Sequence, residues 1–225
     1  MWLDGAPLNA APANGDTYKI YDWGTTIDGN TIIGPGQTNL SFYDIAFTHN
    51  TGDAPVVLWG YSYAIFRYCK IVSTGAEYAL VVGQADSEMY NSLIQVTVAG
   101  GYIGLELENC AQFELNGVKI LGYGGANGVG IRVMTSSTLG AIRNGSEISG
   151  FNQDICLMDK SSGQAWTSSR TSFIHGGNAY GIRAESGGGF RAASGLTYGT
   201  KLDGTADANG ANTSADAASY SYISA

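Results

Sequence analysis

The sequence predicts an all-β protein whose chain coils on itself as a solenoid. Three observations point to it: the composition, an internal period, and glycine-rich corners between the repeats. The chain of 225 residues contains 33 glycines and only 13% charged residues. Because glycine costs about 1 kcal/mol relative to alanine inside a helix, this composition disfavours long helices. The length suits one sizeable core, so we expect a single domain.

The period comes from one sequence shape that returns along the chain, a polar or glycine lead-in followed by an apolar alternation, as in EYALVVG at 78 to 84. The first inward-facing residues of this series, at steps of 24 to 27 residues, are predicted to be Ile32, Val56, Leu80, Leu105, Ile131, Ile155 and Ile182. A second series lies between them at steps of 24 to 28 residues: Phe47, Ile71, Val96, Ile120, Ile148, Ile174 and Tyr198. The two series predict two strands per turn, in register with the next turn.

The length and rhythm of the period separate the possible repeat folds. A propeller blade needs about 40 residues or more, and a leucine-rich repeat places a helical segment opposite its strand. Both halves of this period alternate as strands do, which leaves a parallel β-helix with turns stacked at roughly 4.8 Å. Asn116-Gly117 and Asn144-Gly145 are predicted corners, since these residue types tolerate left-handed backbone. The segment 122 to 130 reads as a wide corner, because it lacks the lysine of a phosphate loop and leads into a strand.

In this rhythm, and in the entry segment TTIDGNTIIGPGQTNLSFYDIAF at 25 to 47, the chain resembles the pectate-lyase-like (pectin lyase-like) parallel β-helix proteins, and most closely the phage tailspikes. The resemblance covers roughly residues 20 to 200 and includes no linear catalytic motif. It implies a right-handed, single-stranded parallel β-helix of about seven rungs, assembled as a homotrimer. The chain would be either a piece of a tailspike or a short virion protein built from the same helix.

Three regions are expected around this coil. Residues 1 to 19 are small, polar and proline-containing, and we expect an N-terminal cap or arm over the open end. Residues 20 to 200 form the β-helix. Residues 201 to 225 form a low-complexity tail, and its closing SYSYISA is expected to add a short strand to a neighbour or to its own sheet.

Charge and reactive residues exclude several functions. The net charge of −8, without a cluster of lysine and arginine, disfavours nucleic acid and anionic membrane surfaces as partners. Cys69, Cys110 and Cys156 lie tens of residues apart, as expected of free buried thiols. His49 and His175 are too distant to form a pair, so no metal and no cofactor are expected. Neither a signal peptide nor a transmembrane run is visible, which predicts folding in the host cytoplasm and no membrane insertion.

The outward-facing residues of the first strand series suggest that this side of the solenoid is covered by protein. Alternation places two columns outside, the first being Val57, Val81, Glu106, Arg132, Cys156 and Arg183, and the second Trp59, Gly83, Glu108, Met134, Met158 and Glu185. About half of these residues are apolar, whereas a solvated wall would be mostly polar. We expect a trimer interface that includes Val57, Val81, Met134 and Met158; a covering loop is the alternative.

Glu106 and Glu108 are the candidate catalytic pair. Outward residues at i and i+2 on a strand lie about 6.5 to 7 Å apart, at the lower edge of the carboxylate spacing of inverting glycoside hydrolases. Arg132, one rung on, would hold Glu106 ionised as a base, and Glu108 could keep its proton if covered. The alternative is a cross-rung ion pair between Glu106 and Arg132, with Glu108 at the rim.

The aromatic segment WGYSYAIFRY at 59 to 68 is the candidate sugar-contact site. Trp59, Tyr61 and Tyr63 alternate, so they could present rings on one face for stacking on sugars; packing within the rung is the alternative. The sequence therefore predicts a phage virion surface protein that contacts other virion proteins and a host cell-surface polysaccharide. The alternative function is a polysaccharide depolymerase, either a hydrolase or a lyase.

Overall fold

The regular structure of the chain is entirely β. The computed structural model describes residues 2–3, 6–7, 25–38, 40–98, 100, 102–109, 111–123, 128–165, 173–174, 180–184, 186–192, 197–198, 213–215 and 220–223. Within these ranges there are 26 strands and no helix. Two short strands, β1 (Trp2–Leu3) and β2 (Ala6–Pro7), pair with each other antiparallel, and every other strand belongs to one of three parallel sheets.

Each turn of the chain contributes one strand to each sheet. Sheet 1 contains β4 (Thr31–Ile33), β7 (Val56–Trp59), β10 (Tyr78–Gly83), β13 (Ile103–Glu108), β16 (Val129–Val133), β19 (Gln153–Leu157), β22 (Tyr180–Ala184) and β25 (Thr213–Ala215). Sheet 2 contains β5 (Leu40–Tyr43), β8 (Tyr63–Arg67), β11 (Asp86–Tyr90), β14 (Gln112–Asn116), β17 (Thr138–Arg143), β20 (Ser162–Ala165), β23 (Gly189–Ala192) and β26 (Tyr220–Ile223). Sheet 3 contains β3 (Thr25–Asp28), β6 (Ile45–His49), β9 (Lys70–Ser73), β12 (Leu93–Val96), β15 (Lys119–Leu121), β18 (Glu147–Ser149), β21 (Phe173–Ile174) and β24 (Thr197–Tyr198).

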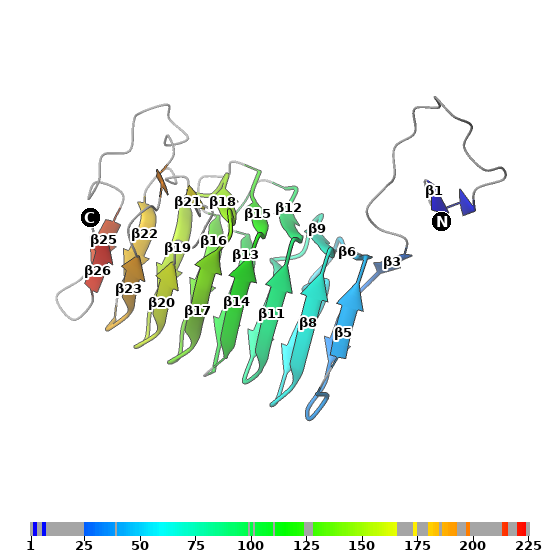
Figure 1. Cartoon of the computed structure of the whole chain (residues 1–225), viewed down its shortest axis with the longest axis horizontal. Coiled ribbons are helices and arrows are strands. Elements are labelled where there is room, and N and C mark those ends of the chain that lie inside the picture. The colour runs from blue at the N-terminus through cyan, green and yellow to red at the C-terminus, as the bar shows by residue number, and fades with distance from the viewer. Residues whose placement is uncertain are drawn as a thin grey trace.

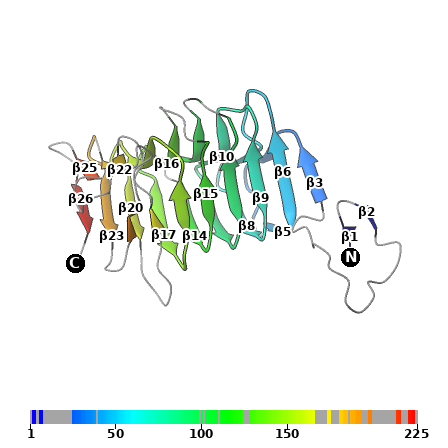
Figure 2. The same cartoon turned by 90° about the horizontal axis from the view of Figure 1, so that it is seen from above.

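The sheets form a parallel β-solenoid whose strands lie side by side along the long axis of the molecule (Figures 1 and 2). The predicted number of strands per turn is corrected from two to three, because sheet 2 lies between the two predicted series. About five turns are described rather than the predicted seven, and they extend from β4 to β18. Strands β19 to β26 continue the three sheets, although many of the residues that join them fall outside the described ranges.

The predicted inward column of sheet 1 is confirmed. Leu80, Leu105, Ile131, Ile155 and Ile182 are successive partners in parallel strand pairs, and each side chain is 0% exposed. The stacked side chains exclude water along the inside of the coil, and burying each one contributes about 1.5 to 3 kcal/mol. The alternation of β side chains therefore establishes this wall of the core.

The predicted register was wrong at two positions. Ile32 is 69% exposed and pairs with Val57, while its neighbour Ile33 is the buried residue of β4. In sheet 3, Ile94 rather than Val96 stacks between its neighbours of the adjacent turns. Where two apolar residues stand one or two positions apart, the sequence pattern fits either register, and only pairing with the adjacent strand decides between them.

An aromatic cluster fills the core of the first two turns. The rings of Phe42 and Phe66 stack with centroids 5.1 Å apart, and Phe47 meets Phe66 edge-on at 6.2 Å. Such ring pairs add about 0.5 to 1.5 kcal/mol to the stabilisation that burial of their area provides. These ring contacts stabilise the strands of the first two turns.

Left-handed residues recur at the corners of the coil. The corner between sheets 2 and 3 has a positive φ in five successive turns, at Asp44, Tyr68, Asn91, Gly117 and Asn144. The predicted Asn-Gly corners are therefore confirmed at Gly117, and at Asn144 with Gly145, whereas Asn116 ends β14. The side-chain carbonyl of Asn116 accepts a hydrogen bond of 2.7 Å from Asn144 Nδ2, which links two turns.

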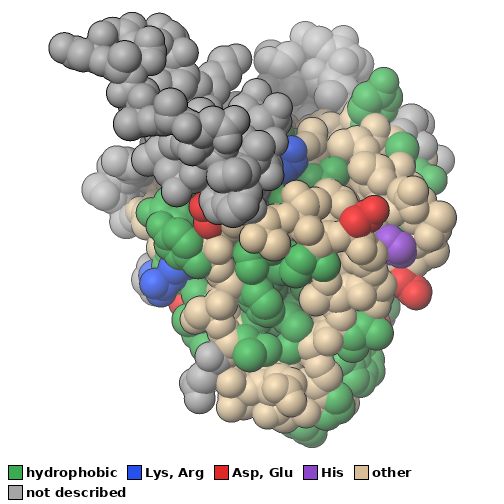
Figure 3. All heavy atoms as spheres, turned by 90° about the vertical axis from the view of Figure 1, so that its right-hand side faces the viewer, with side chains coloured by type: hydrophobic (Ala, Val, Ile, Leu, Met, Phe, Trp, Pro, Cys, Tyr) green, Lys and Arg blue, Asp and Glu red, His purple; other side chains and the backbone are tan. Residues whose placement is uncertain are grey.

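The two ends of the coil can be compared with the predicted N-terminal cap and C-terminal tail. In the segment expected to be a tail, Tyr220–Ile223 pairs in parallel with β23, so the closing strand joins its own sheet. Figure 3 views the other end, where hydrophobic side chains reach the surface; Ile32, Leu40 and Phe42 line a hollow there. The cap expected at 1 to 19 lies outside the described residues except for β1 and β2, so it stays a prediction.

The prediction of buried thiols outside a disulfide framework is confirmed where the cysteines are described. Cys69 and Cys156 are buried and form no disulfide with a described residue, and burial raises the pKa of the Cys69 thiol. Cys110, His175, Glu185 and residues 124 to 127 of the predicted wide corner at 122 to 130 lie outside the described residues.

Candidate functional site

The outer face of sheet 1 carries the predicted outward column in the predicted register. Val57 pairs with Val81, Val81 with Glu106, and Glu106 with Arg132, and the column continues through Cys156 to Arg183. Glu106 and Cys156 are buried and the others are half-buried. Met134 and Met158, which belong to the second column, are also half-buried.

The candidate catalytic Glu106 forms the cross-rung ion pair that was the alternative prediction. Its carboxylate is bound by the guanidinium of Arg132, which also lies over the ring of Tyr78 with its Cζ atom 5.7 Å from the centroid. Burial raises the pKa of Glu106, while the charge of Arg132 opposes that shift. Glu108 is half-buried. The Glu106 carboxylate therefore faces a neighbouring side chain rather than the solvent.

The three aromatic residues of the candidate sugar-contact site do not share one face. Trp59 ends β7 in sheet 1, and a Cβ atom at Gly83 would overlap its ring, so the ring lies directly over the backbone of the next turn. Tyr61 lies in the corner that follows, and Tyr63 begins β8 in sheet 2. The structure brings Tyr61 and Tyr63 together and places Trp59 on the neighbouring wall.

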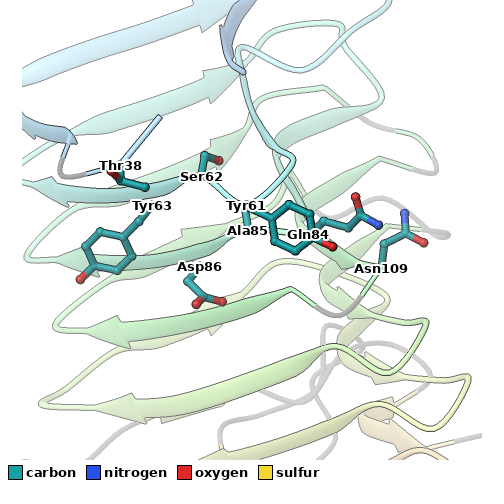
Figure 4. Close-up of a pocket in the computed structure, with 8 residues that line it drawn as sticks. All are labelled: Thr38, Tyr61, Ser62, Tyr63, Gln84, Ala85, Asp86 and Asn109. Atoms are coloured by element: carbon teal, nitrogen blue, oxygen red, sulfur yellow. The ribbon is translucent and has the colours of Figure 1, made fainter. Parts of the chain in front are cut away.

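Tyr61 and Tyr63 line an open pocket of about 530 Å³ at the corner between sheets 1 and 2, which we call the corner pocket (Figure 4). Its full lining is Thr38, Tyr61, Ser62, Tyr63, Gln84, Ala85, Asp86 and Asn109. Figure 4 shows Tyr63 and Asp86 on one side and Gln84 and Asn109 on the other, with the ring of Tyr61 between them. The pocket thus combines aromatic rings with amide, hydroxyl and carboxylate groups from several turns.

Tyr61 occupies a strained backbone position. Its φ is 60°, in the left-handed region that bulky residues avoid, and its side chain is 81% exposed. The corner holds it there through a backbone hydrogen bond of 2.5 Å from its N–H to the carbonyl of Gln84. A side chain that buries so little does not offset that strain by packing. Strained residues concentrate at functional sites, which makes Tyr61 a candidate contact residue.

Ser62 contributes a polar group to the pocket wall. The residue is 2% exposed, and its Oγ has no hydrogen-bond partner among the described residues. A buried hydroxyl left without a partner costs about 1 to 3 kcal/mol. Because this oxygen is enclosed within the wall of the corner pocket, Ser62 shapes the pocket and does not present its hydroxyl to a ligand.

The outer face of sheet 2 continues from the pocket as a polar network. The hydroxyl of Tyr63 donates to Glu88 Oε1 at 2.7 Å, and Tyr90 donates to the other carboxylate oxygen. These two hydrogen bonds hold the pKa of Glu88 below its ordinary value. Partial burial, together with the hydrogen bond to Glu88, raises the pKa of Tyr63 to about 12. The Cζ of Arg67 lies 5.0 Å from the centroid of the Tyr90 ring.

Sheet 2 also gathers carboxylates that sequence reasoning missed. Glu88 pairs directly with Glu114 of the next turn, and Asp86 precedes Glu88 on the same face. Arg143 donates to Glu114 Oε2 at 3.0 Å and so offsets the repulsion between the two glutamates. The signal was present in the sequence, because Glu88 and Glu114 are one period apart within the similar segments DSEMY and QFELN.

The fold and this surface define the class of the protein, a parallel β-solenoid with a polar and aromatic outer face. Comparison of the chain with family models, with curated proteins and with solved structures finds no match. The structure is consistent with a resemblance to β-helix proteins at the level of the fold alone. None of the described residues forms a helix that is long and apolar enough to cross a membrane.

Proposed function

We propose that this chain is a rigid solenoid that binds a host-surface glycan through the corner pocket and the adjoining face of sheet 2, as a surface protein of a phage virion. The corner pocket carries the proposal. Its volume of about 530 Å³ lies within the range of small-molecule sites, and it combines two tyrosine rings with polar groups of several kinds. Sugars present apolar CH faces and hydroxyl groups, so they match a lining that is partly aromatic and partly polar.

The backbone around the pocket favours binding because it is already fixed. Parallel pairs join β8 to β11 and β11 to β14 over five residues each. The buried Phe66 and Met89 hold these strands from inside the coil. A site on such a frame loses little conformational entropy when a ligand binds, which increases the affinity available from a few contacts. The proposed role of the solenoid is therefore to present the pocket in one geometry.

Tyr61 gives a test that separates binding from folding. Replacing Tyr61 with Gly relieves the left-handed strain, so we expect Tyr61→Gly to stabilise the protein by about 1 kcal/mol. The same change removes a pocket ring, so we expect binding to weaken about tenfold, a loss of about 1.4 kcal/mol. Binding is measured on a glycan array and then by calorimetry with the best ligand. Tyr123→Ala is the control, since Tyr123 is also exposed but does not line the pocket.

Two results would count against glycan binding at the pocket: no glycan bound by the wild-type protein, or unchanged affinity in Tyr61→Gly. The virion role rests on the fold-level resemblance and has its own test. We expect the gene to lie among genes for phage structural proteins, and mass spectrometry to detect the protein in purified particles. Absence from the particles would leave a glycan-binding protein with another location.

A depolymerase is the second candidate, and the carboxylates of sheet 2 favour it. Asp86, Glu88 and Glu114 lie on one face in neighbouring turns. Glycoside hydrolysis, however, needs a protonated carboxylic acid beside an ionised one. Glu88 is held ionised by two tyrosine hydroxyls, and Glu114 accepts a hydrogen bond from Arg143. Both groups are thus arranged to accept hydrogen bonds, which favours binding over cleavage.

Product analysis distinguishes the two candidates. The wild-type protein is incubated with a polysaccharide that it binds, and new reducing or unsaturated ends are measured. We expect none. Release of oligosaccharides that stops in Glu88→Gln would replace the binding proposal with an enzyme on sheet 2. Loss of activity in Glu106→Gln or Glu108→Gln would instead identify the pair predicted from the sequence.

We also propose that three copies associate through the outer face of sheet 1. This face carries the half-buried Val57, Val81, Met134 and Met158. Each such side chain contributes about 1.5 to 3 kcal/mol when it is fully buried, so three copies together could drive association. Sheet 2 would then stay accessible to a glycan on the outside of the assembly.

A further inference from the structure

The charge of the corner pocket determines which glycans it would accept, an inference that rests on the function proposed above. Asp86 is the only charged residue among its eight lining residues, and none of them is lysine or arginine. The Asp86 side chain is exposed, and its carboxylate forms no hydrogen bond or ion pair with a described residue. It is therefore available to a ligand.

No described residue around the pocket neutralises this carboxylate. Glu88 stands two positions further along β11 on the same face and receives the hydroxyl of Tyr63. Arg67 lies over the ring of Tyr90, and Arg143 is paired with Glu114. Both arginines have partners away from the pocket lining. Since the whole chain also carries a net charge of −8, an approaching anion meets a negative field.

The other polar groups of the lining are uncharged. The amides of Gln84 and Asn109 and the hydroxyls of Thr38 and Tyr61 can donate to or accept from sugar hydroxyls. A carboxylate accepts hydrogen bonds from hydroxyl or ammonium groups, and such charge-assisted bonds are about twice as strong as neutral ones. The same carboxylate repels the carboxylate of a uronic acid or a sulfate group, because like charges brought together cost several kcal/mol.

We propose that the corner pocket takes a sugar without acidic groups, that Asp86 binds its hydroxyl groups or an amine, and that Asp86 excludes uronic acids and sulfated sugars. Asp86 is thus a specificity-determining residue. The charge of Asp86 selects against acidic sugars. The choice among neutral sugars then depends on how their shape and hydroxyl groups fit the partly aromatic lining.

The test uses a glycan array that carries matched neutral, amine-bearing, carboxylated and sulfated sugars. We expect the wild-type protein to bind neutral and amine-bearing members at least tenfold more strongly than their acidic counterparts. Asp86→Asn should weaken binding of the neutral sugars about tenfold and reduce the discrimination against acidic ones to about twofold or less. Asp53→Asn is the matched control: it removes the same charge from an exposed corner between β6 and β7 and should leave both values unchanged.

The outcomes separate this inference from the proposed function. Equal or stronger binding of acidic sugars by the wild-type protein overturns the selectivity and leaves glycan binding intact. The role of Asp86 is overturned if Asp86→Asn keeps the preference for non-acidic sugars. It is also overturned if Asp53→Asn reduces that preference as much as Asp86→Asn does. If no sugar of any class binds, the proposed function fails and the selectivity fails with it.

Discussion

The outer faces of sheets 1 and 2 each carry a glutamate and an arginine that pair between the same two turns, yet the two pairs have different surroundings. Glu106 and Arg132 join β13 to β16, with side chains 6% and 28% exposed. Glu114 and Arg143 join β14 to β17, with side chains 34% and 35% exposed. The backbone ladder is parallel in both places. The repeat therefore fixes where an outward residue stands, and its neighbours decide whether it is covered.

Those neighbours also give the two faces a different chemical character. Around Glu106 lie apolar residues such as Val81, and a buried charge needs a close partner because water cannot solvate it. Around Glu114 lie tyrosines, amides and further carboxylates that water reaches. The first face suits contact with another copy of the chain, and the second suits a polar ligand. Four changes, taken from the largest expected effect to the smallest, test this difference.

The mass of the assembly should respond to a charge on sheet 1 and not to one on sheet 2. We expect the wild-type protein at micromolar concentration to have the mass of three chains by light scattering. Met134→Glu places a carboxylate in the proposed interface and should reduce the mass to that of one chain. Gln112→Glu adds the same charge to the exposed face of sheet 2 and should leave a trimer. A wild-type monomer, or loss of the trimer in Gln112→Glu only, would contradict the assignment.

Breaking the two Glu–Arg pairs should have unequal effects on stability. Glu106→Ala leaves the guanidinium of Arg132 without its carboxylate in a largely buried place, and we expect it to lower the free energy of unfolding by about 2 to 3 kcal/mol. Glu114→Ala breaks an exposed pair and should cost less than about 1 kcal/mol. Urea denaturation at pH 7 measures both values. Equal losses would show that the two faces do not differ in burial.

A methyl group added to the two faces should also act differently. A Cβ atom at Gly83 would overlap the ring of Trp59, so Gly83→Ala must displace that ring, and we expect a loss of about 1 kcal/mol. At Gly140 the nearest atom is Glu114 Cγ at 3.1 Å, on a side chain that can move. Gly140→Ala should therefore be neutral or stabilise by about 0.5 kcal/mol. Thermal unfolding gives both values, and tryptophan fluorescence should change only in Gly83→Ala.

The pH dependence of stability should have opposite signs on the two faces. The pKa of Glu88 is lowered by its tyrosine hydrogen bonds, so its contribution is present above pH 4.5 and is lost as the pH falls through its folded pKa. The pKa of Glu106 is raised by burial, so its contribution is present below pH 4.5 and is lost as the pH rises through its folded pKa. Melting temperatures between pH 3 and 7 measure this difference.

Two glutamine variants isolate the two contributions. Relative to the wild-type protein, Glu88→Gln should become less stable as the pH rises from 3 to 5. Glu106→Gln should become relatively more stable as the pH rises above 4.5. Parallel curves for the two variants would contradict the assignment of these pKa shifts to the two environments.

The sequence by itself determined the inner architecture of this protein. Successive strand residues point to opposite sides, so a period of 24 to 28 residues with an apolar alternation predicts a parallel coil and the inward column from Leu80 to Ile182. Regular alternation also located the outward partners Glu106 and Arg132, because residues one period apart become neighbours in a stacked coil. The left-handed corners at Gly117 and Asn144 followed from residue type alone.

The tertiary structure decided what the pattern left ambiguous. The choice between Ile32 and Ile33, and between Ile94 and Val96, depends on hydrogen bonds to a strand about 24 residues away, which no local pattern contains. Sheet 2 was missed because its outward side chains are polar and its strands resemble corners. The corner pocket was missed because Tyr61, Asp86 and Asn109 come from three different turns, and only the stacking of those turns brings their side chains around one hollow.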